Sequence, residues 1–124
     1  MKHSIVSRRP LAALAAAALL CAGLAGFSLA QQGERVVRIT AERYSYEPEK
    51  IVLKKGQPVI LELVAEDRMH GFNSLALGIR ADVLPDQAVR VRLVPDKVGT
   101  FPFICDVFCG SGHGEMGGVI TVVE

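Results

Sequence analysis

The amino-acid sequence predicts an all-β fold, a sandwich of about seven short strands formed by residues 31–124. Three observations support this prediction. The chain has 124 residues, which is the length of one domain. Short apolar segments alternate with turn residues along it, and no stretch of useful length has the periodicity of a helix. The region contains no internal repeat and no linker.

Three strands are expected in the first half of this region: Arg35–Thr40, Lys50–Leu53 and Pro58–Ala65. The second is followed by the turn sequence Lys-Lys-Gly-Gln. In the third, Val59, Leu61 and Leu63 share one face of the strand, because successive side chains point to opposite sides. This pattern predicts a strand with at least one buried side.

Four strands are expected in the second half: Phe72–Leu77, Val89–Leu93, Thr100–Ile104 and Val119–Glu124. Gly78 ends the first of them. The second is the clearest of the chain, because its apolar residues alternate with Arg90 and Arg92. Pro102 lacks a backbone N–H, so the third strand is expected to lie at an edge or to contain a bulge.

Residues 1–30 have the order of a secretory signal peptide. A basic start that includes Arg8-Arg9 precedes the apolar segment Leu11–Ala30, which ends in small residues. We expect cleavage near Gln31 and therefore export to the periplasm. The adjacent arginines also fit a twin-arginine signal. Twenty apolar residues are long enough to remain as an uncleaved anchor, and a membrane is an expected partner only in that case.

The charge balance argues against a nucleic-acid partner. Lys and Arg total 14 and Asp and Glu total 13, which gives a formal net charge of +1. Residues 1–30 contain no acidic residue, so the remainder of the chain is slightly acidic. Binding to phosphates needs concentrated positive charge, which this composition does not supply.

The most informative segment is a loop with four potential soft metal ligands. Its two cysteines, one histidine and one methionine are spaced by four, four and three residues: Cys105, Cys109, His113 and Met116. A second histidine, His70, lies further upstream. Thiolate, thioether and imidazole donors together select copper over hard cations such as Mg²⁺ and Ca²⁺. The sequence therefore predicts a copper site.

The spacing allows either one or two copper ions. A mononuclear blue-copper site needs one cysteine, two histidines and a weak methionine ligand, a set that this chain supplies through Cys109, His70, His113 and Met116. Cys105 is then surplus. Alternatively, the two thiolates bridge two copper ions, and each ion receives one histidine.

The loop and the sequence His70-Gly71-Phe72 resemble the CuA domain of cytochrome c oxidase subunit II and of nitrous oxide reductase. The resemblance rests on the pattern Cys-x-x-x-Cys-x-x-x-His-x-x-Met between two strands and covers most of residues 31–124. It implies a cupredoxin-like Greek-key β-sandwich with two copper ions per chain. It also implies a ligand set with two bridging cysteines, one histidine per copper and two weak donors: Cys105, Cys109, His70, His113, Met116 and the backbone carbonyl of Val107.

The resemblance implies an electron carrier rather than an enzyme. In such a centre, one added electron changes the total charge of the two thiolates and the mixed-valence copper pair by one unit. Both metals share this change, so little rearrangement of the ligands is expected. All coordination positions belong to the protein, so outer-sphere electron transfer is expected. The implied partner is a redox protein of a periplasmic respiratory chain, such as a c-type cytochrome or a terminal reductase.

Two departures from the resemblance concern tuning and docking. Position 107 carries Val, whereas the resembling domains usually carry Glu or Trp there. The chain contains no Trp, so the aromatic docking patch of the oxidase subunit is missing.

Other interpretations of the loop stay open. The same ligands would serve a periplasmic copper chaperone or storage protein that supplies an oxidase or reductase. The cysteines could form a small-loop disulfide, as we expect in copper-free material, or take part in a zinc site with the two histidines. Asp106 and Glu115 are expected to be solvated charges, and Met69 a loop or core residue. Five glycines are expected to give the loop backbone freedom: Gly110, Gly112, Gly114, Gly117 and Gly118.

Overall fold

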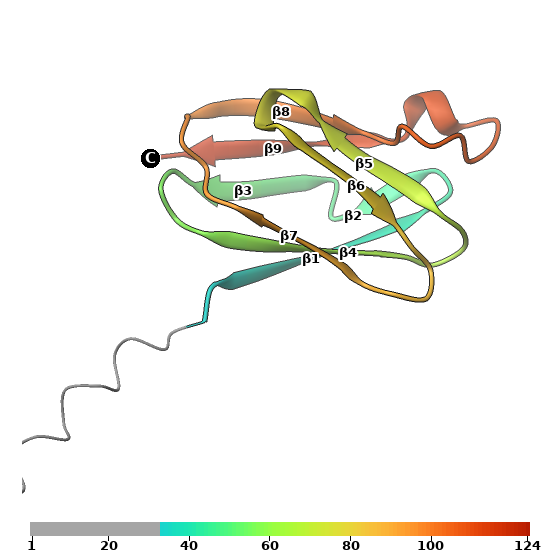
Figure 1. Cartoon of the computed structure of the whole chain (residues 1–124). Coiled ribbons are helices and arrows are strands. Elements are labelled where there is room, and N and C mark those ends of the chain that lie inside the picture. The colour runs from blue at the N-terminus through green and yellow to red at the C-terminus, as the bar shows by residue number, and fades with distance from the viewer. Residues whose placement is uncertain (1–32) are drawn as a thin grey trace, which may run out of the picture. The chain divides into compact units, whose positions relative to one another are not determined.

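Two β-sheets packed face to face form the part of the chain that the computed structural model describes, residues 33–124 (Figure 1). The predicted signal peptide, residues 1–30, and its cleavage point lie outside the described residues. Within residues 33–124, no helix has the length and apolar character needed to cross a membrane. The all-β prediction is confirmed, with nine strands in the described residues where about seven were expected.

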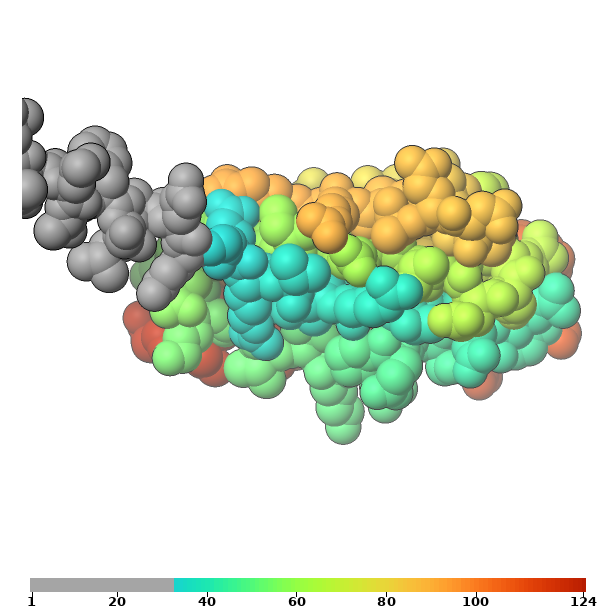
Figure 2. Space-filling model, turned by 90° about the horizontal axis from the view of Figure 1, so that it is seen from below, coloured from blue at the N-terminus to red at the C-terminus, as the bar shows by residue number. Residues whose placement is uncertain are grey.

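The first sheet has four strands in the order β2-β1-β4-β7: Ser45–Glu47, Arg35–Glu42, Val59–Ala65 and Val89–Leu93. β1 pairs with β4 in parallel, and β4 pairs with β7 antiparallel. The inward side chains of β4 are fully buried and the outward ones half-buried, which matches the predicted alternation. Figure 2 looks onto the outer face of this sheet, with β1 in cyan and the β7 region in orange.

The second sheet has five strands in the order β3-β9-β8-β5-β6: Lys50–Lys54, Gly117–Val123, Gly99–Ile104, His70–Ser74 and Ile79–Val83. β3 pairs with β9 in parallel, and the other pairs are antiparallel. The β5–β8 pairing consists of one register pair, Asn73 with Ile104. β8 is therefore not the edge strand that Pro102 led us to expect, but Pro102 lies where β8 is paired with β9 alone, so its missing N–H leaves no ladder bond unmade.

Two strands, β2 and β6, were not predicted from the sequence, and one predicted strand extends too far toward the C-terminus. β2 has only three residues, too few for a periodic signal. β6 carries the alternation of buried Ile79, Ala81 and Val83 with exposed charged residues, a signal that was present and overlooked. The predicted strand Phe72–Leu77 ends earlier, because Leu75–Leu77 forms the 3-10 helix η1 before Gly78 turns the chain at φ +67°.

An aromatic cluster occupies the core beside the loop that contains the cysteines. Phe72 and Phe103 stack with ring centroids 4.6 Å apart, and Tyr46 meets both rings edge-on at 5.9 and 5.1 Å. All three side chains are buried. Burying one such ring contributes roughly 1.5–3 kcal/mol. The cluster joins β2, β5 and β8, and so gives the end of the sandwich a rigid base.

Candidate metal centre

The loop between β8 and β9 and the start of β5 lie at the end of the sandwich opposite the C-terminus (Figure 1). His70 begins β5, and Cys105 directly follows β8. The loop between β8 and β9 contains Cys109 and the 3-10 helix η2, His113–Glu115, and Met116 ends it. Two segments far apart in sequence thus supply the donors.

The thiol of Cys105 has three potential metal ligands around it. Its Sγ lies 3.9 Å from Sγ of Cys109, 4.0 Å from Nδ1 of His70 and 3.2 Å from the carbonyl oxygen of Val107. The donor atoms of His70, Cys105 and Cys109 all lie within 4.8 Å of one another. With metal–ligand bonds of about 2.0–2.3 Å, donors on a common metal lie about 3–4.5 Å apart. The spacing therefore fits a metal.

The thiol of Cys109 has an equivalent set on its own side. Its Sγ lies 3.6 Å from Nδ1 of His113 and 3.8 Å from Sδ of Met116. Each sulfur consequently has one imidazole nitrogen and one weak donor beside it. These positions agree with the ligand set implied by the sequence, although the roles of the six residues as ligands stay a prediction.

Burial isolates the two thiols from water. Cys109 and Met116 are each 1% exposed, Cys105 is 3% exposed and His70 is fully buried, whereas His113 is half-buried. Burial, and then the neighbouring Cys105, raise the pKa of the Cys109 thiol. Since a soft metal binds the thiolate, metal binding must release this proton.

The loop is held in shape by backbone hydrogen bonds and by Tyr44. The Cys105 N–H donates to the Met116 carbonyl at 3.0 Å, and the His113 N–H donates to the Gly110 carbonyl at 3.2 Å. Gly110 has φ +138°, and a Cβ there would overlap the Tyr44 hydroxyl. For this glycine, both backbone freedom and close packing on a ring are required.

Asp67 fixes the orientation of the His70 ring and was missed in the sequence. Its Oδ1 lies 2.7 Å from His70 Nε2, which leaves Nδ1 directed toward Cys105. Burial acts to raise the pKa of Asp67, but hydrogen bonds from His70 and from the N–H groups of Arg43 and Arg68 lower it to about 2. A carboxylate three residues before a candidate histidine ligand was the available signal.

Gly71 brings the aromatic core into contact with the site. Its N–H donates to Sγ of Cys105 at 3.4 Å, and its carbonyl accepts a hydrogen bond from the buried Tyr46 hydroxyl. Burial raises the pKa of Tyr46, so this hydroxyl stays protonated and remains a donor. The short strand β2 that carries Tyr46 gave no signal in the sequence.

Asp106 is an exposed residue, as expected, and it is also paired with a charged partner. Its side chain is 24% exposed and accepts two hydrogen bonds from Arg80, each 3.0 Å long. Glu115 is exposed, as expected, and Met69 lies in the loop before β5 with 41% of its surface exposed. The Arg80 partner could not be foreseen, because the strand that carries it was overlooked.

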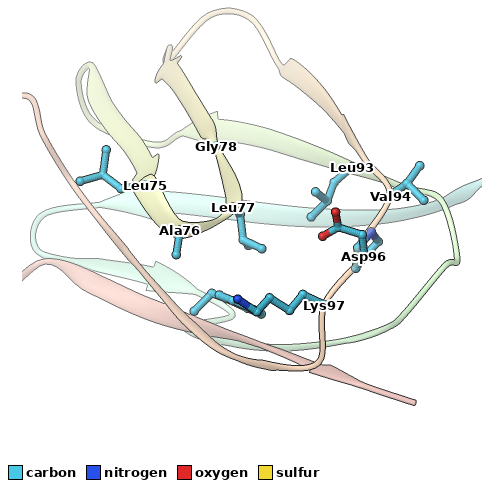
Figure 3. A pocket seen from close by; sticks show the side chains of 10 residues that line it. Leu75, Ala76, Leu77, Gly78, Leu93, Val94, Asp96 and Lys97 are labelled. Carbon is cyan, nitrogen blue, oxygen red and sulfur yellow. The ribbon is translucent and has the colours of Figure 1, made fainter.

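A pocket of about 410 Å³ lies between η1 and the segment that follows β7 (Figure 3). Its lining includes Leu75, Leu77, Leu93 and Lys97. None of the six predicted ligands lines it, so this pocket and the metal site are separate features.

Comparison with known proteins decides the family. A model of the cupredoxin-like domain matches residues 10–122. The chain belongs to the cupredoxin-like domain family. This agrees with the fold and with the resemblance stated from the loop residues.

Two relatives of this cupredoxin are a subunit of an oxidase and a reductase. Cytochrome c oxidase subunit 2 of Thermus thermophilus is 32% identical over 88 residues, which cover 71% of the chain and 65% of the relative. Nitrous-oxide reductase of Ralstonia nicotianae is 36% identical over 91 residues, or 69% of the chain and 14% of the relative. This cupredoxin therefore spans less than two thirds of the length of either relative.

Two solved structures share its fold. The periplasmic domain of subunit II of cytochrome oxidase from Bradyrhizobium japonicum has a TM-score of 0.67 and 19% identity, and covers 73% of this chain and 84% of that one. The metal-binding domain of the Cu(I) exporting P-type ATPase CopA of Streptococcus pneumoniae D39, solved with Cu(I), has a TM-score of 0.59 and 27% identity. It covers 76% and 90% of the two chains.

Proposed function

We propose that this cupredoxin is a one-electron carrier with a binuclear CuA-type centre of two copper ions. The observation that supports it most is the pair of sulfurs 3.9 Å apart, each with its own imidazole nitrogen within 4.0 Å. A mononuclear site leaves Cys105 without a role. With a binuclear site, both thiols would serve as bridging ligands.

The residues present fit copper by their chemistry. Two thiols, two imidazoles and a thioether form a soft donor set that binds copper in preference to hard cations. The proposed ligands are His70, Cys105, Val107 through its carbonyl, Cys109, His113 and Met116. When bound, copper would supply the one-electron couple. Zinc would use the same thiols and imidazoles but would leave the thioether of Met116 without a function.

The chain itself supplies charge compensation and a dry, fixed environment. Two thiolates offset much of the metal charge, and the buried His70, Cys109 and Met116 keep water away from them. Asp67 holds one imidazole in a single orientation. Ligands that cannot move far need little rearrangement when an electron arrives or leaves, which favours outer-sphere transfer over binding of a substrate.

The surface beside His113 offers a place for a redox partner. Phe108 is 71% exposed, and its ring centroid lies 5.6 Å from that of His113. A partner that docks on this ring approaches one edge of the centre without passing through the core. We propose a periplasmic partner such as a c-type cytochrome or a terminal reductase. Export through residues 1–30 is part of the proposal.

Copper delivery is the second candidate function. The observation in its favour is the likeness to the metal-binding domain of a copper-exporting ATPase. A delivery protein must release its metal, whereas four of the six proposed donors here are buried, and His70 and the ligand loop are held by hydrogen bonds. Burial of these donors favours the electron carrier over the copper-delivery protein.

A chelator challenge combined with voltammetry tests the proposed function. The full chain loaded with copper is dialysed against a strong copper chelator and then cycled between its oxidised and reduced states. A carrier keeps its copper and gives a reversible one-electron wave. Loss of copper to the chelator without a reversible wave would favour delivery instead.

A further inference from the structure

Beyond the ligands, a carboxylate within the ligand loop is tied to the neighbouring strands. Asp106 accepts hydrogen bonds from Nε and Nη2 of Arg80, both at 3.0 Å, and from Nδ2 of Asn73 at 3.1 Å. The Arg80 contacts are two parallel N–H···O bonds, the geometry in which a guanidinium holds a carboxylate most specifically. Arg80 also contacts Asp82, its neighbour on β6.

The hydrogen bonds from Arg80 and Asn73 to Asp106 replace backbone pairing where the sheet ends. β5 and β8 share one register pair, Asn73 with Ile104, and beyond it the chain leaves the sheet as the ligand loop. On the other side of the loop, the Cys105 N–H is bonded to the Met116 carbonyl. Toward β5 and β6, side-chain bonds to Asp106 take the place of a backbone ladder.

The position of Asp106 couples it to both halves of the donor set. It lies between Cys105 and Val107, whose Sγ and carbonyl oxygen are 3.2 Å apart. A Cβ on Gly71 would overlap Oδ1 of Asp106, so the carboxylate lies directly against the strand that carries His70. Movement of Asp106 would therefore change the distance between Cys105 and His70.

We propose that Arg80 is a positioning residue of the metal centre, because its two hydrogen bonds to Asp106 tie the ligand loop to strand β6, which pairs with the strand β5 that carries His70. The role toward copper rests on the proposed function. The clamp, which is the pair of hydrogen bonds between Arg80 and Asp106, involves the chain's own side chains alone. It restricts the movement of Cys105 relative to His70 and so fixes the donor spacing before a metal binds.

The test compares Arg80→Gln with a matched control, Arg92→Gln. Arg92 makes a similar exposed pair, with Glu34 at 2.7–3.1 Å, on the other sheet. A second control, Asp82→Asn, removes the other partner of Arg80, and Arg80→Lys keeps the charge but loses the two parallel bonds.

The first readout uses the reduced, metal-free chain and iodoacetamide, with the alkylation of each cysteine followed by mass spectrometry. We expect Cys105 to react about fivefold faster in Arg80→Gln, the factor that corresponds to one lost charged contact. Asp82→Asn and Arg92→Gln should react as wild type does, and Arg80→Lys should be intermediate. Equal rates in Arg80→Gln and Arg92→Gln would overturn the proposal. If Arg80→Gln does not fold, the contrast between Arg80→Lys and Arg92→Gln decides in the same way.

The second readout is the electron-spin spectrum and the reduction potential of the copper-loaded chains. Arg80→Gln should show a broadened spectrum and a shifted potential, and Arg80→Lys should recover part of both, whereas a residue with a merely structural role would leave them unchanged. A spectrum and a reduction potential of Arg80→Gln equal to those of Arg92→Gln would contradict the positioning role. A wild-type chain with a single copper would refute the proposed function alone, because the alkylation contrast needs no metal.

Discussion

Asp67 and His70 are joined by a 2.7 Å hydrogen bond between a carboxylate oxygen and Nε2, which directs the other ring nitrogen toward Sγ of Cys105. The pair lies at the start of β5, where the histidine is fully buried and the carboxylate is partly exposed. An imidazole that is fixed in this way offers its lone pair in one direction. Such partners make a metal-binding histidine more effective.

The first prediction concerns this pair. Asp67→Ala should weaken copper binding by about 10–100-fold, because the His70 ring loses the acceptor that sets its orientation. Competition with a chelator of known affinity measures the effect. Asp67→Asn keeps an acceptor oxygen and should retain most of the affinity. Equal affinities of wild type and Asp67→Ala would show that the hydrogen bond does not orient the ligand.

The second prediction separates bridging donors from weak ones. Cys109→Ser should abolish the coupled centre, even if one copper remains, since it removes a sulfur that both copper ions would share in the proposed centre. Met116→Leu should preserve the centre and raise its reduction potential, because loss of a weak donor destabilises the oxidised form more than the reduced form. Electron-spin spectra and voltammetry of the two variants provide the test. The assignment fails if Met116→Leu destroys the centre or Cys109→Ser keeps it.

The third prediction concerns thermal stability. A metal that binds only the folded chain stabilises it by about 4 kcal/mol at a concentration one thousandfold above its dissociation constant. Copper should therefore raise the Tm strongly, and the Cys109→Ser variant should gain less. Calorimetry on loaded and metal-free protein measures both. Identical melting curves with copper still bound would mean that the donors are not part of the folded core.

The fourth prediction concerns pH and Glu62 on β4, in the four-stranded sheet. Hydrogen bonds from Arg38 and Arg90, at 2.7 and 3.0 Å, lower the pKa of Glu62 below its ordinary value of 4.5. A lowered pKa means that the unfolded chain binds this proton more readily. The stabilisation is complete above about pH 4.5 and is lost as the pH falls through the lower, folded-state pKa.

Denaturation of Glu62→Gln and wild type between pH 7 and pH 2 tests this. The difference in the free energy of unfolding should be largest near neutral pH and should shrink below about pH 4.5. Glu47→Gln, on the exposed side of β2, removes one carboxylate outside this ion-pair group and serves as the control. A difference between Glu62→Gln and wild type that is constant with pH would show that the two arginines do not stabilise the charged form.

Local patterns made much of the fold and of the candidate ligand loop predictable. The alternation in Val59–Ala65 and in Val89–Leu93 is visible in the sequence, and both segments are strands in the structure. The two cysteines, His113 and Met116 lie close in the sequence, so their spacing indicates that they are donors to one metal site. His70 is a candidate ligand from its residue type, its role comes from the resemblance, and its Nδ1 lies 4.0 Å from Sγ of Cys105.

The parts that were missed depend on contacts between distant segments. Arg80 and Asp106 are separated by 26 residues, and only the pairing of β5 with β6 and β8 brings them together. Tyr46 is an unremarkable residue in a three-residue strand, yet its hydroxyl reaches the strand that carries His70. Spacing along the chain carries no information on such contacts, which arise from the packing of strands.

The electron-spin spectrum of the oxidised, copper-loaded chain, together with its copper content, tests the central proposal most directly. Two copper ions per chain and a signal split about equally by both nuclei are expected, because Sγ of Cys105 and Sγ of Cys109 lie 3.9 Å apart and would both bridge the metals of the proposed centre. One copper per chain, with a blue colour and a signal split by a single nucleus, would contradict the binuclear centre.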